Sequence, residues 1–164
     1  MNKITKKLIN AKFDKNRLVE FDIIEDFWDA GSANKSSLGV LLGNRESKDA
    51  LCCLGFCTLP VFKKSDIYQV TFPSDISHYS RNKKSEYIVD LLASQLAPEF
   101  TDKLYKKYKS MNSSFMYLLE DKNYECLLAN VNDTTLIPKA IKKRIISFIF
   151  SHLGVKVSWR KINE

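Results

Sequence analysis

The spacing of apolar residues changes along the chain, and each spacing predicts a different kind of element. Residues 1–19 are basic and weakly helical in pattern, whereas residues 20–29 carry acidic side chains and no basic one. Apolar side chains in the acidic part recur three or four residues apart, which is typical of one face of a helix. They are Phe21, Ile24, Phe27 and Trp28. The pattern therefore predicts a helical N-terminal region that is basic first and acidic second.

Shorter apolar runs follow a polar loop at 31–37 and predict β-strands. Three of them are joined by short polar turns, as in an antiparallel meander. These three segments are 38–42, 50–62 and 67–72. Segments 115–120 and 125–131 flank another turn and predict a hairpin. Apolar and polar side chains alternate over 155–162, which predicts a last, half-exposed strand.

Three helices are predicted in the second half of the chain. The first begins near Ser85, a residue suited to the N-cap, and is broken by Pro98. The second begins near Thr101 and turns its lysines outward. The third covers 138–153, because a proline lies in its first turn and Gly154 follows its end.

These elements predict a single α+β domain over residues 1–164. Its sheet is expected to be mixed and mainly antiparallel, formed by the three-stranded meander and the later strands, with helices packed on it. The composition supports one folded unit: 45% of the residues are hydrophobic, and there are only 5 Gly and 4 Pro. That is enough apolar material for a core and too little Gly and Pro for a linker.

The charge balance favours polyanionic partners. Lys and Arg number 26 against 19 Asp and Glu, a formal net charge of +7. An excess of this sign is expected to attract nucleic acid or an acidic protein face. The candidate binding residues fall in two helical clusters and at the C-terminal end: Lys103, Lys106, Lys107 and Lys109; Lys139, Lys142, Lys143 and Arg144; Arg160 and Lys161. Binding to nucleic acid through them would be directed at the backbone and sensitive to salt.

Cofactor and metal chemistry find little support in the sequence. No glycines have the spacing of a phosphate-binding loop, so no nucleotide cofactor is expected. Cys52, Cys53 and Cys57 are expected on a strand, which would separate them too far to share a zinc ion. We therefore predict no metal site and interpret these cysteines as small core residues. His152 is interpreted as a packed or capping residue at a helix end.

Three carboxylates offer an alternative chemistry. Asp22, Asp26 and Asp29 would share one face of the N-terminal helix, at spacings of i, i+4 and i+7. A metal-dependent nuclease could use such a patch, and so could an acidic docking face. The solvated side of an amphipathic helix gives the same pattern.

No membrane or export segment is predicted. The basic start of the chain is not followed by an apolar run, unlike a secretory signal. No stretch approaches the roughly 18 apolar residues of a membrane-spanning helix. We therefore expect a cytoplasmic protein.

The order of the predicted elements resembles the GNAT-type N-acetyltransferase fold. Residues 67–73 are similar to its central strand, and residues 81–86 to its pyrophosphate loop before an apolar helix. Arg81 matches the motif of that loop, while Lys84 and Glu86 occupy its glycine positions. The resemblance implies a degenerate acyltransferase that holds an acyl-carrier phosphate near His78, Arg81, Lys83 and Lys84.

The leading hypothesis is a non-catalytic binding protein. It would be an intracellular accessory, regulatory or immunity-type factor that contacts a polyanionic or acidic partner through its basic helix faces. The GNAT-like acyltransferase and the nuclease based on the three carboxylates remain alternatives.

Overall fold

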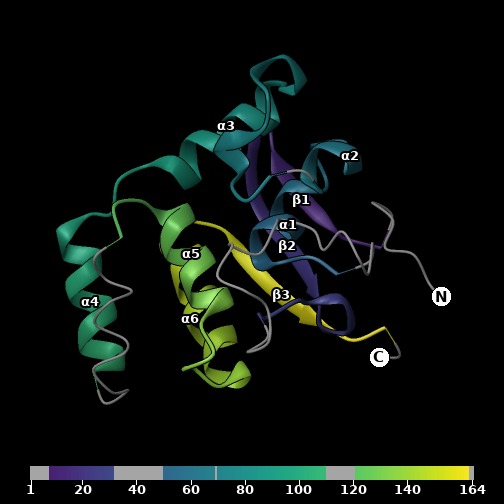
Figure 1. The fold of residues 1–164 in the computed structure, drawn as a ribbon. Helices are drawn as coiled ribbons and strands as arrows, with labels where there is room; N and C mark the ends of the chain where they lie inside the picture. Colours follow the sequence, from purple (N-terminus) through teal and green to yellow (C-terminus); the bar gives the residue numbers. More distant parts are fainter. Residues whose placement is uncertain (1–7, 32–49, 69, 110–120, 163–164) are drawn as a thin grey trace.

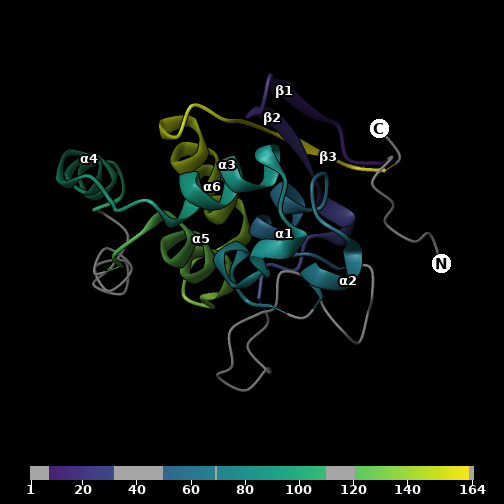
Figure 2. The same cartoon turned by 90° about the horizontal axis from the view of Figure 1, so that it is seen from above.

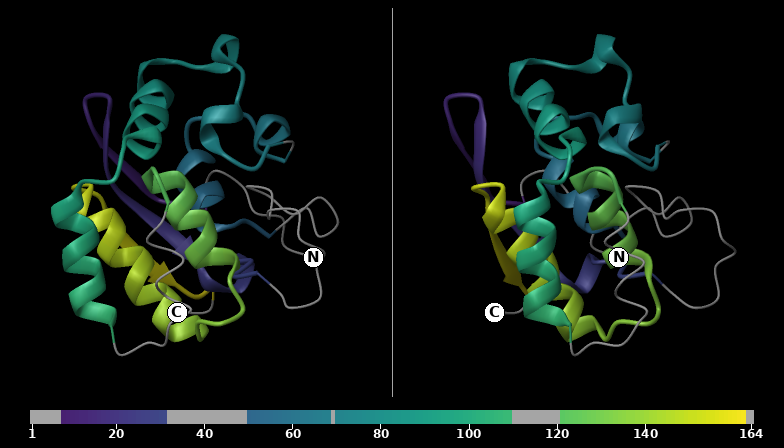
Figure 3. Two further views of the ribbon diagram at one scale, coloured as in Figure 1. Left: turned by 60° about the vertical axis from the view of Figure 1, so that its left-hand side comes forward. Right: turned by 90° about the vertical axis from the view of Figure 1, so that its left-hand side faces the viewer.

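Strand β2 (Arg17–Ile24) lies at the centre of a three-stranded sheet. It pairs antiparallel with β1 (Ala11–Asp14) and parallel with β3 (Lys156–Arg160). This computed structural model describes four segments of the chain: 8–31, 50–68, 70–109 and 121–162. In Figure 1 the helices lie in front of the strands, and the turned views of Figure 3 show the sheet on one side of the molecule and the helices on the other. The predicted class, an α+β domain with a mixed sheet, is confirmed.

The N-terminal region is a β-hairpin, so the helix predicted over 20–29 is wrong. A two-residue turn joins β1 to β2, and Lys15 within it has φ of 56°, as the turns of tight hairpins require. Phe21 and Ile23 are fully buried. Ile23 does not belong to the proposed helical stripe, whereas a period of two puts it beside Phe21 on the inner face. Only one 3-10 turn, η1 (Glu25–Phe27), follows β2.

The strands predicted over 50–62 and 67–72 are also wrong. Helix α1 (Cys53–Thr58) occupies the first segment, and α2 (Lys64–Ile67) ends where the second was expected to begin. All six residues of α1 are buried. An element without a solvent-facing side shows no amphipathic period, so a short buried helix and a buried strand look alike in sequence. The strand predicted over 38–42 lies outside the described residues.

A further helix replaces the predicted hairpin. Segment 125–131 belongs to α5 (Tyr124–Asp133). The side chain of Asn123 caps this helix by accepting a hydrogen bond from the backbone N–H of Cys126 at 2.9 Å. The helix is buried on several sides, which again hides its period. Its predicted partner strand, 115–120, lies outside the described residues.

The remaining helices confirm the sequence interpretation with shifted ends. Helix α3 (Lys83–Ala93) is capped by Asn82, and Ser85 is the third residue of the helix. Helix α4 (Pro98–Tyr108) begins at the proline expected to precede it, because Pro fits the first helical turn.

The C-terminal elements were predicted most accurately. Helix α6 (Lys139–His152) ends one residue before its expected limit, and Gly154 beyond it has φ of 75°. Such a left-handed residue is typical of a helix C-terminus. β3 (Lys156–Arg160) lies within the predicted strand and is half-exposed.

The core lies between the inner face of the sheet and the helices. The ring of Phe21 on β2 meets Phe150 of α6 edge-to-face, with centroids 4.9 Å apart. Helix α5 packs beside α6, α1 packs against α5 and β2, and α3 packs against β2. Seen from above, α4 and α2 lie at opposite ends of the molecule (Figure 2). Helix α4 contacts α6 through aromatic side chains.

Candidate functional site: a basic groove between two helices

Helix α4 packs on α6 in an antiparallel direction. Phe100, near the start of α4, stacks on His152 at the end of α6, with ring centroids 4.2 Å apart. Tyr108, the last residue of α4, meets Phe148 edge-on at 6.3 Å. Phe100 also stacks on Phe148 at 5.9 Å and contacts Tyr124 of α5 at 5.4 Å. These rings fix which residues of the two helices face each other.

A groove of about 380 Å³ opens where the end of α4 meets α6 and β3. We call it the basic groove, and it is defined by the residues that line it: Lys107, Tyr108, Lys143, Arg144, Ser147 and Trp159. Three of the six are cationic, and two are aromatic. Members of both helical clusters predicted from the sequence therefore meet at one place.

Two of the three cations of the groove lie over aromatic rings. The ammonium group of Lys107 is 4.1 Å from the ring centroid of Phe148. That of Lys143 is 5.4 Å from the ring centroid of Trp159, and it also forms a salt bridge with Glu25. Both distances are within the range of a cation–π interaction, which holds a charge in place without neutralising it.

The aromatic residues of the groove are fixed by their own contacts. Trp159 packs edge-to-face on Trp28 at 4.6 Å, and its indole N–H donates to Ser147 Oγ at 2.9 Å. Tyr108 is only 7% exposed. Burial raises the pKa of its hydroxyl, and the nearby positive charge of Arg144 opposes that rise. The hydroxyl therefore stays protonated at neutral pH.

The other basic residues of α4 extend the positive surface. Lys103, Lys106 and Lys109 are all exposed, as predicted. Burial lowers the pKa of the His152 imidazole, and the positive charge of Lys103 lowers it further. Lys107 is the lysine of α4 that lines the groove.

Lys142 corrects the predicted cluster on α6. It is 3% exposed and does not belong to a surface patch. Its ammonium group donates to the backbone carbonyls of Asn132, at 2.7 Å, and Ala30. Burial lowers its pKa, although nearby Asp133 favours the charged form. Lys142 fastens the end of α5 to the segment after β2. Lys139 is exposed, and its ammonium group lies 5.1 Å from the ring centroid of Trp28.

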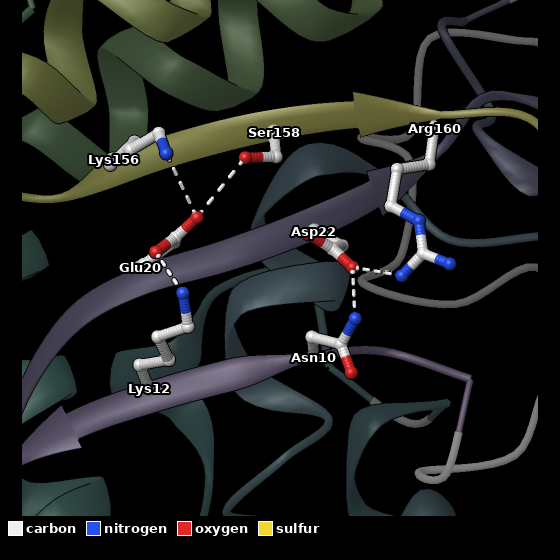
Figure 4. Close-up of polar contacts among 7 residues, drawn as sticks. All are labelled: Asn10, Lys12, Glu20, Asp22, Lys156, Ser158 and Arg160. Carbon is white, nitrogen blue, oxygen red and sulfur yellow. Dashed lines mark hydrogen bonds and ion pairs between the residues drawn. The ribbon is translucent and has the colours of Figure 1, made fainter.

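Arg160 is held on the open face of the sheet. Its guanidinium group donates to the carboxylate of Asp22 at 2.6 Å, and Asn10 donates to the same oxygen at 3.0 Å (Figure 4). Beside them, the carboxylate of Glu20 pairs with Lys12 at 2.7 Å and Lys156 at 3.1 Å. These charges neutralise one another. Arg160 therefore does not join the groove, and Lys161 follows it as an exposed residue.

The three predicted carboxylates do not share a helix face, because they do not lie on one helix. Asp22 belongs to β2 and is 4% exposed. Asp26 lies in η1 and accepts a hydrogen bond from the backbone N–H of Ile162, and Asp29 accepts one from that of Gly31. Among the described residues, no group of three or more His, Cys, Asp or Glu side chains is placed to hold a metal ion.

The predicted acyl-carrier loop is built differently from the expected one. Arg81 holds the loop itself, donating to the carbonyls of Ser74 at 2.7 Å and Ile76 at 2.6 Å. The loop contains the short helices η2 (Pro73–Asp75) and η3 (His78–Ser80). Four residues of this region were predicted to hold a phosphate: His78, Arg81, Lys83 and Lys84. His78, Lys83 and Lys84 are exposed, and Lys84 lies 4.6 Å from the ring of Phe13. Residues 67–73 were compared with the central strand of the GNAT-type fold, and the described residues of this segment do not form a strand.

The cysteines are core residues, as interpreted, but for another structural reason. Cys52, Cys53 and Cys57 are buried at and within α1, where Cys53 and Cys57 share a helix face. Burial raises the pKa of the Cys52 thiol to about 12 and raises that of Cys53 and Cys57 well above the ordinary value. Thiols in this state are poor nucleophiles and poor metal ligands at neutral pH.

Ser147 lines the groove and Phe148 lies under the ammonium group of Lys107, yet neither was among the residues expected to bind a partner. Their spacing in the sequence indicates that they lie beside the basic residues, since Ser147 follows Lys143 by four residues and Phe148 follows Arg144 by four. Side chains at this spacing are neighbours on a helix surface. The spacing does not indicate that α4 covers this part of α6.

The chain matches no family model, no curated protein and no solved structure. Within the described residues, no helix is both long and apolar enough to span a membrane.

Proposed function

We propose that this chain is a non-catalytic binding protein that holds a polyanionic or acidic partner at the basic groove. One observation carries the proposal: Lys107 of α4 lines the same groove as Lys143 and Arg144 of α6. Cations brought together from distant parts of the chain repel one another. A negatively charged partner would relieve that repulsion and would be steered to the site by the positive field.

Two of the three charges at the groove are available to a partner. Glu25 pairs with Lys143, but Lys107 and Arg144 form no salt bridge with any acid in the described part of the chain. On the sheet, Asp22 forms a salt bridge with Arg160, and Glu20 forms salt bridges with Lys12 and Lys156. Helix α4 and the following Lys109 carry four lysines against two acids, Glu99 and Asp102, and the groove adds Lys143 and Arg144.

The chemistry of the cysteines supports a binding role over thiol catalysis. A nucleophilic cysteine needs a lowered pKa and access to substrate. Burial gives Cys52, Cys53 and Cys57 the opposite properties. Four free thiols are typical of a reducing compartment, so we propose the cytoplasm as the setting.

The test is a charge reversal at the groove rim. Polyglutamate and a short duplex DNA, each labelled with a fluorophore, are titrated with the protein at low and physiological salt, and anisotropy is recorded. The proposal predicts that wild type binds at least one probe, with affinity that falls steeply with salt. Lys107→Glu and Arg144→Glu should each weaken that binding about tenfold, because each replaces attraction with repulsion.

Lys63→Glu is the matched control. Lys63 is exposed beside α2, at the opposite end of the molecule from α4 (Figure 2), and its reversal changes the net charge by the same amount. It should leave affinity nearly unchanged. Equal weakening by all three variants would attribute binding to net charge alone. Absence of binding to both probes at low salt would overturn the proposal.

A further inference from the structure

The shape of the basic groove favours one kind of partner. Its volume of about 380 Å³ is at the small end of the range for ligand pockets, about 300–1,000 Å³. A hollow of this size holds one large side chain and not a whole helix. Tyr108 and Trp159 contribute aromatic surface to its lining, and the three cations surround it. A single short segment of a partner could therefore reach both the apolar lining of the groove and the charges around it.

Trp159, the largest aromatic residue of the groove, offers little surface for stacking nucleic-acid bases. It packs edge-to-face on Trp28, Lys143 lies over its ring, and its N–H is bonded to Ser147. Tyr108 is buried and touches Phe148. Proteins that bind single strands instead present open rings on which successive bases stack. A single-stranded nucleic acid would therefore gain only its backbone charge here.

Duplex nucleic acid fits the hollow no better. A duplex presents its phosphates on a convex surface and has no apolar group that protrudes between them. It could contact the exposed lysines of α4, but the aromatic lining of the groove would remain unfilled. Two of the three groove cations are lysines, whereas arginine is the residue best suited to bidentate phosphate contacts.

An acidic polypeptide matches both parts of the groove. One aromatic side chain would fill the hollow, where it needs only the parts of Tyr108 and Trp159 that line the groove and no open ring face. Carboxylates on its neighbours would reach Arg144 and Lys107, which are exposed at the rim. A buried aromatic anchor with a charged rim is the usual arrangement of an interface hot spot. We infer that the partner bound at the basic groove is an acidic polypeptide segment with one aromatic anchor, an inference that rests on the proposed function.

Two synthetic peptides of equal length and charge test this inference. In one, a central Phe is flanked on both sides by Glu residues. In the other, Ala replaces the Phe. Binding to wild type is measured by calorimetry and by the NMR signal of the Trp159 indole N–H. The Phe peptide should bind about tenfold more tightly, because only it buries an aromatic ring in the hollow. It should also shift the indole signal more strongly than the Ala peptide does.

Ser147→Leu is the specific variant. It fills the groove without changing the charge, and it also removes the hydroxyl that accepts from the Trp159 indole N–H. It should remove the preference for Phe, while weak charge-driven binding of both peptides persists. Ser151→Leu is the matched control, because Ser151 is exposed one turn further along α6 and does not line the groove. This control should keep the full preference. Circular dichroism and the Trp159 signal of the free variant show whether each protein is folded.

The outcomes separate this inference from the proposed function. Equal affinity for the Phe and Ala peptides would overturn the aromatic anchor and leave the proposed function intact. Tighter binding of duplex DNA than of either peptide would replace the acidic polypeptide with nucleic acid. If no peptide, DNA or polyglutamate binds at low salt, the inference and the proposed function both fail.

Discussion

Single buried polar residues join distant parts of this chain, and Asn132 is the clearest case. Its side-chain oxygen accepts from the indole N–H of Trp28 at 2.7 Å and from the backbone N–H of Cys53 at 3.2 Å. Its side-chain nitrogen donates to the carbonyl of Asp29 at 2.8 Å. One fully buried amide thus links the segment after η1, the start of α1 and the end of α5.

Replacing Asn132 by Ala should lower the free energy of unfolding by about 3 kcal/mol, because buried donors on Trp28 and Cys53 lose their acceptor. Asn130→Ala is the control. Asn130 lies on the same helix but is exposed, and its side chain donates to the carboxylate of Asp121 at the surface, so the loss on removing that side chain should be below about 1 kcal/mol. Urea denaturation measures both. Similar losses in the two variants would show that Asn132 does not have this linking role.

Glu20 makes a pH prediction at the same scale. Hydrogen bonds from Lys12 and then Lys156 lower the pKa of its carboxyl from 4.5 to about 2. A lowered pKa in the folded state means that this group stabilises the fold fully above pH 4.5. That contribution is lost as the pH falls towards 2. Carbon NMR of the Glu20 carboxyl measures the pKa directly.

Lys12→Met should raise the pKa of Glu20 more than Lys156→Met, because Lys12 is the nearer partner, at 2.7 Å against 3.1 Å. Lys63→Met, remote from the sheet, should leave it unchanged. A wild-type midpoint near 4.5 would contradict the ion pairs shown in Figure 4.

Elements with one solvent-facing side could be predicted from the sequence, and fully buried elements could not. Helices α3, α4 and α6 carry exposed polar faces, and their apolar spacing indicated them. Helix α1 is buried all round, so its apolar run had no period to identify it. In β2, the apolar residues fitted both a helical and a strand spacing. Pairing with β1 and β3 decides between the two, and that pairing is not local information.

The start of α3 provides a prediction at the element scale. The side-chain oxygen of Asn82 accepts from the backbone N–H of Ser85 at 3.1 Å, and Ser85 Oγ accepts from the backbone N–H of Asn82 at 2.7 Å. Asn82→Ala removes half of this reciprocal cap and should cost about 1 kcal/mol of stability. Asn82→Asp keeps the acceptor and should cost much less. Thermal unfolding distinguishes them, and an equal cost would mean that the cap does not act through this oxygen.

At the scale of the whole molecule, the candidate site depends on how two amphipathic helices meet. The sequence predicted the lysines of α4 and the basic cluster of α6 as separate patches. It could not predict that Lys107 and Arg144 line one groove, because that depends on the packing of Phe100 and Tyr108 on Phe148. The burial of Lys142 was equally hidden, since its partners are backbone carbonyls from remote segments.

Helix α4 lies at one end of the molecule (Figure 2), and Phe100 is its main anchor. That ring is 1% exposed and contacts Tyr124, Phe148 and His152. Removing a buried aromatic side chain costs about 3–5 kcal/mol. Because these contacts hold α4 to α5 and α6, Phe100→Ala should open α4 locally before the sheet unfolds.

Hydrogen–deuterium exchange measures this local opening. Phe100→Ala should accelerate exchange of the α4 amides while those of β2 and α5 stay protected. Phe62→Ala is the control, because Phe62 is equally buried but does not contact α4's aromatic cluster. It should destabilise the core without singling out α4. Since α4 supplies Lys107 and Tyr108, Phe100→Ala should also weaken binding of the acidic Phe peptide. Equal acceleration in α4 and β2 would instead show that α4 unfolds only with the whole domain, and that the groove is as stable as the core.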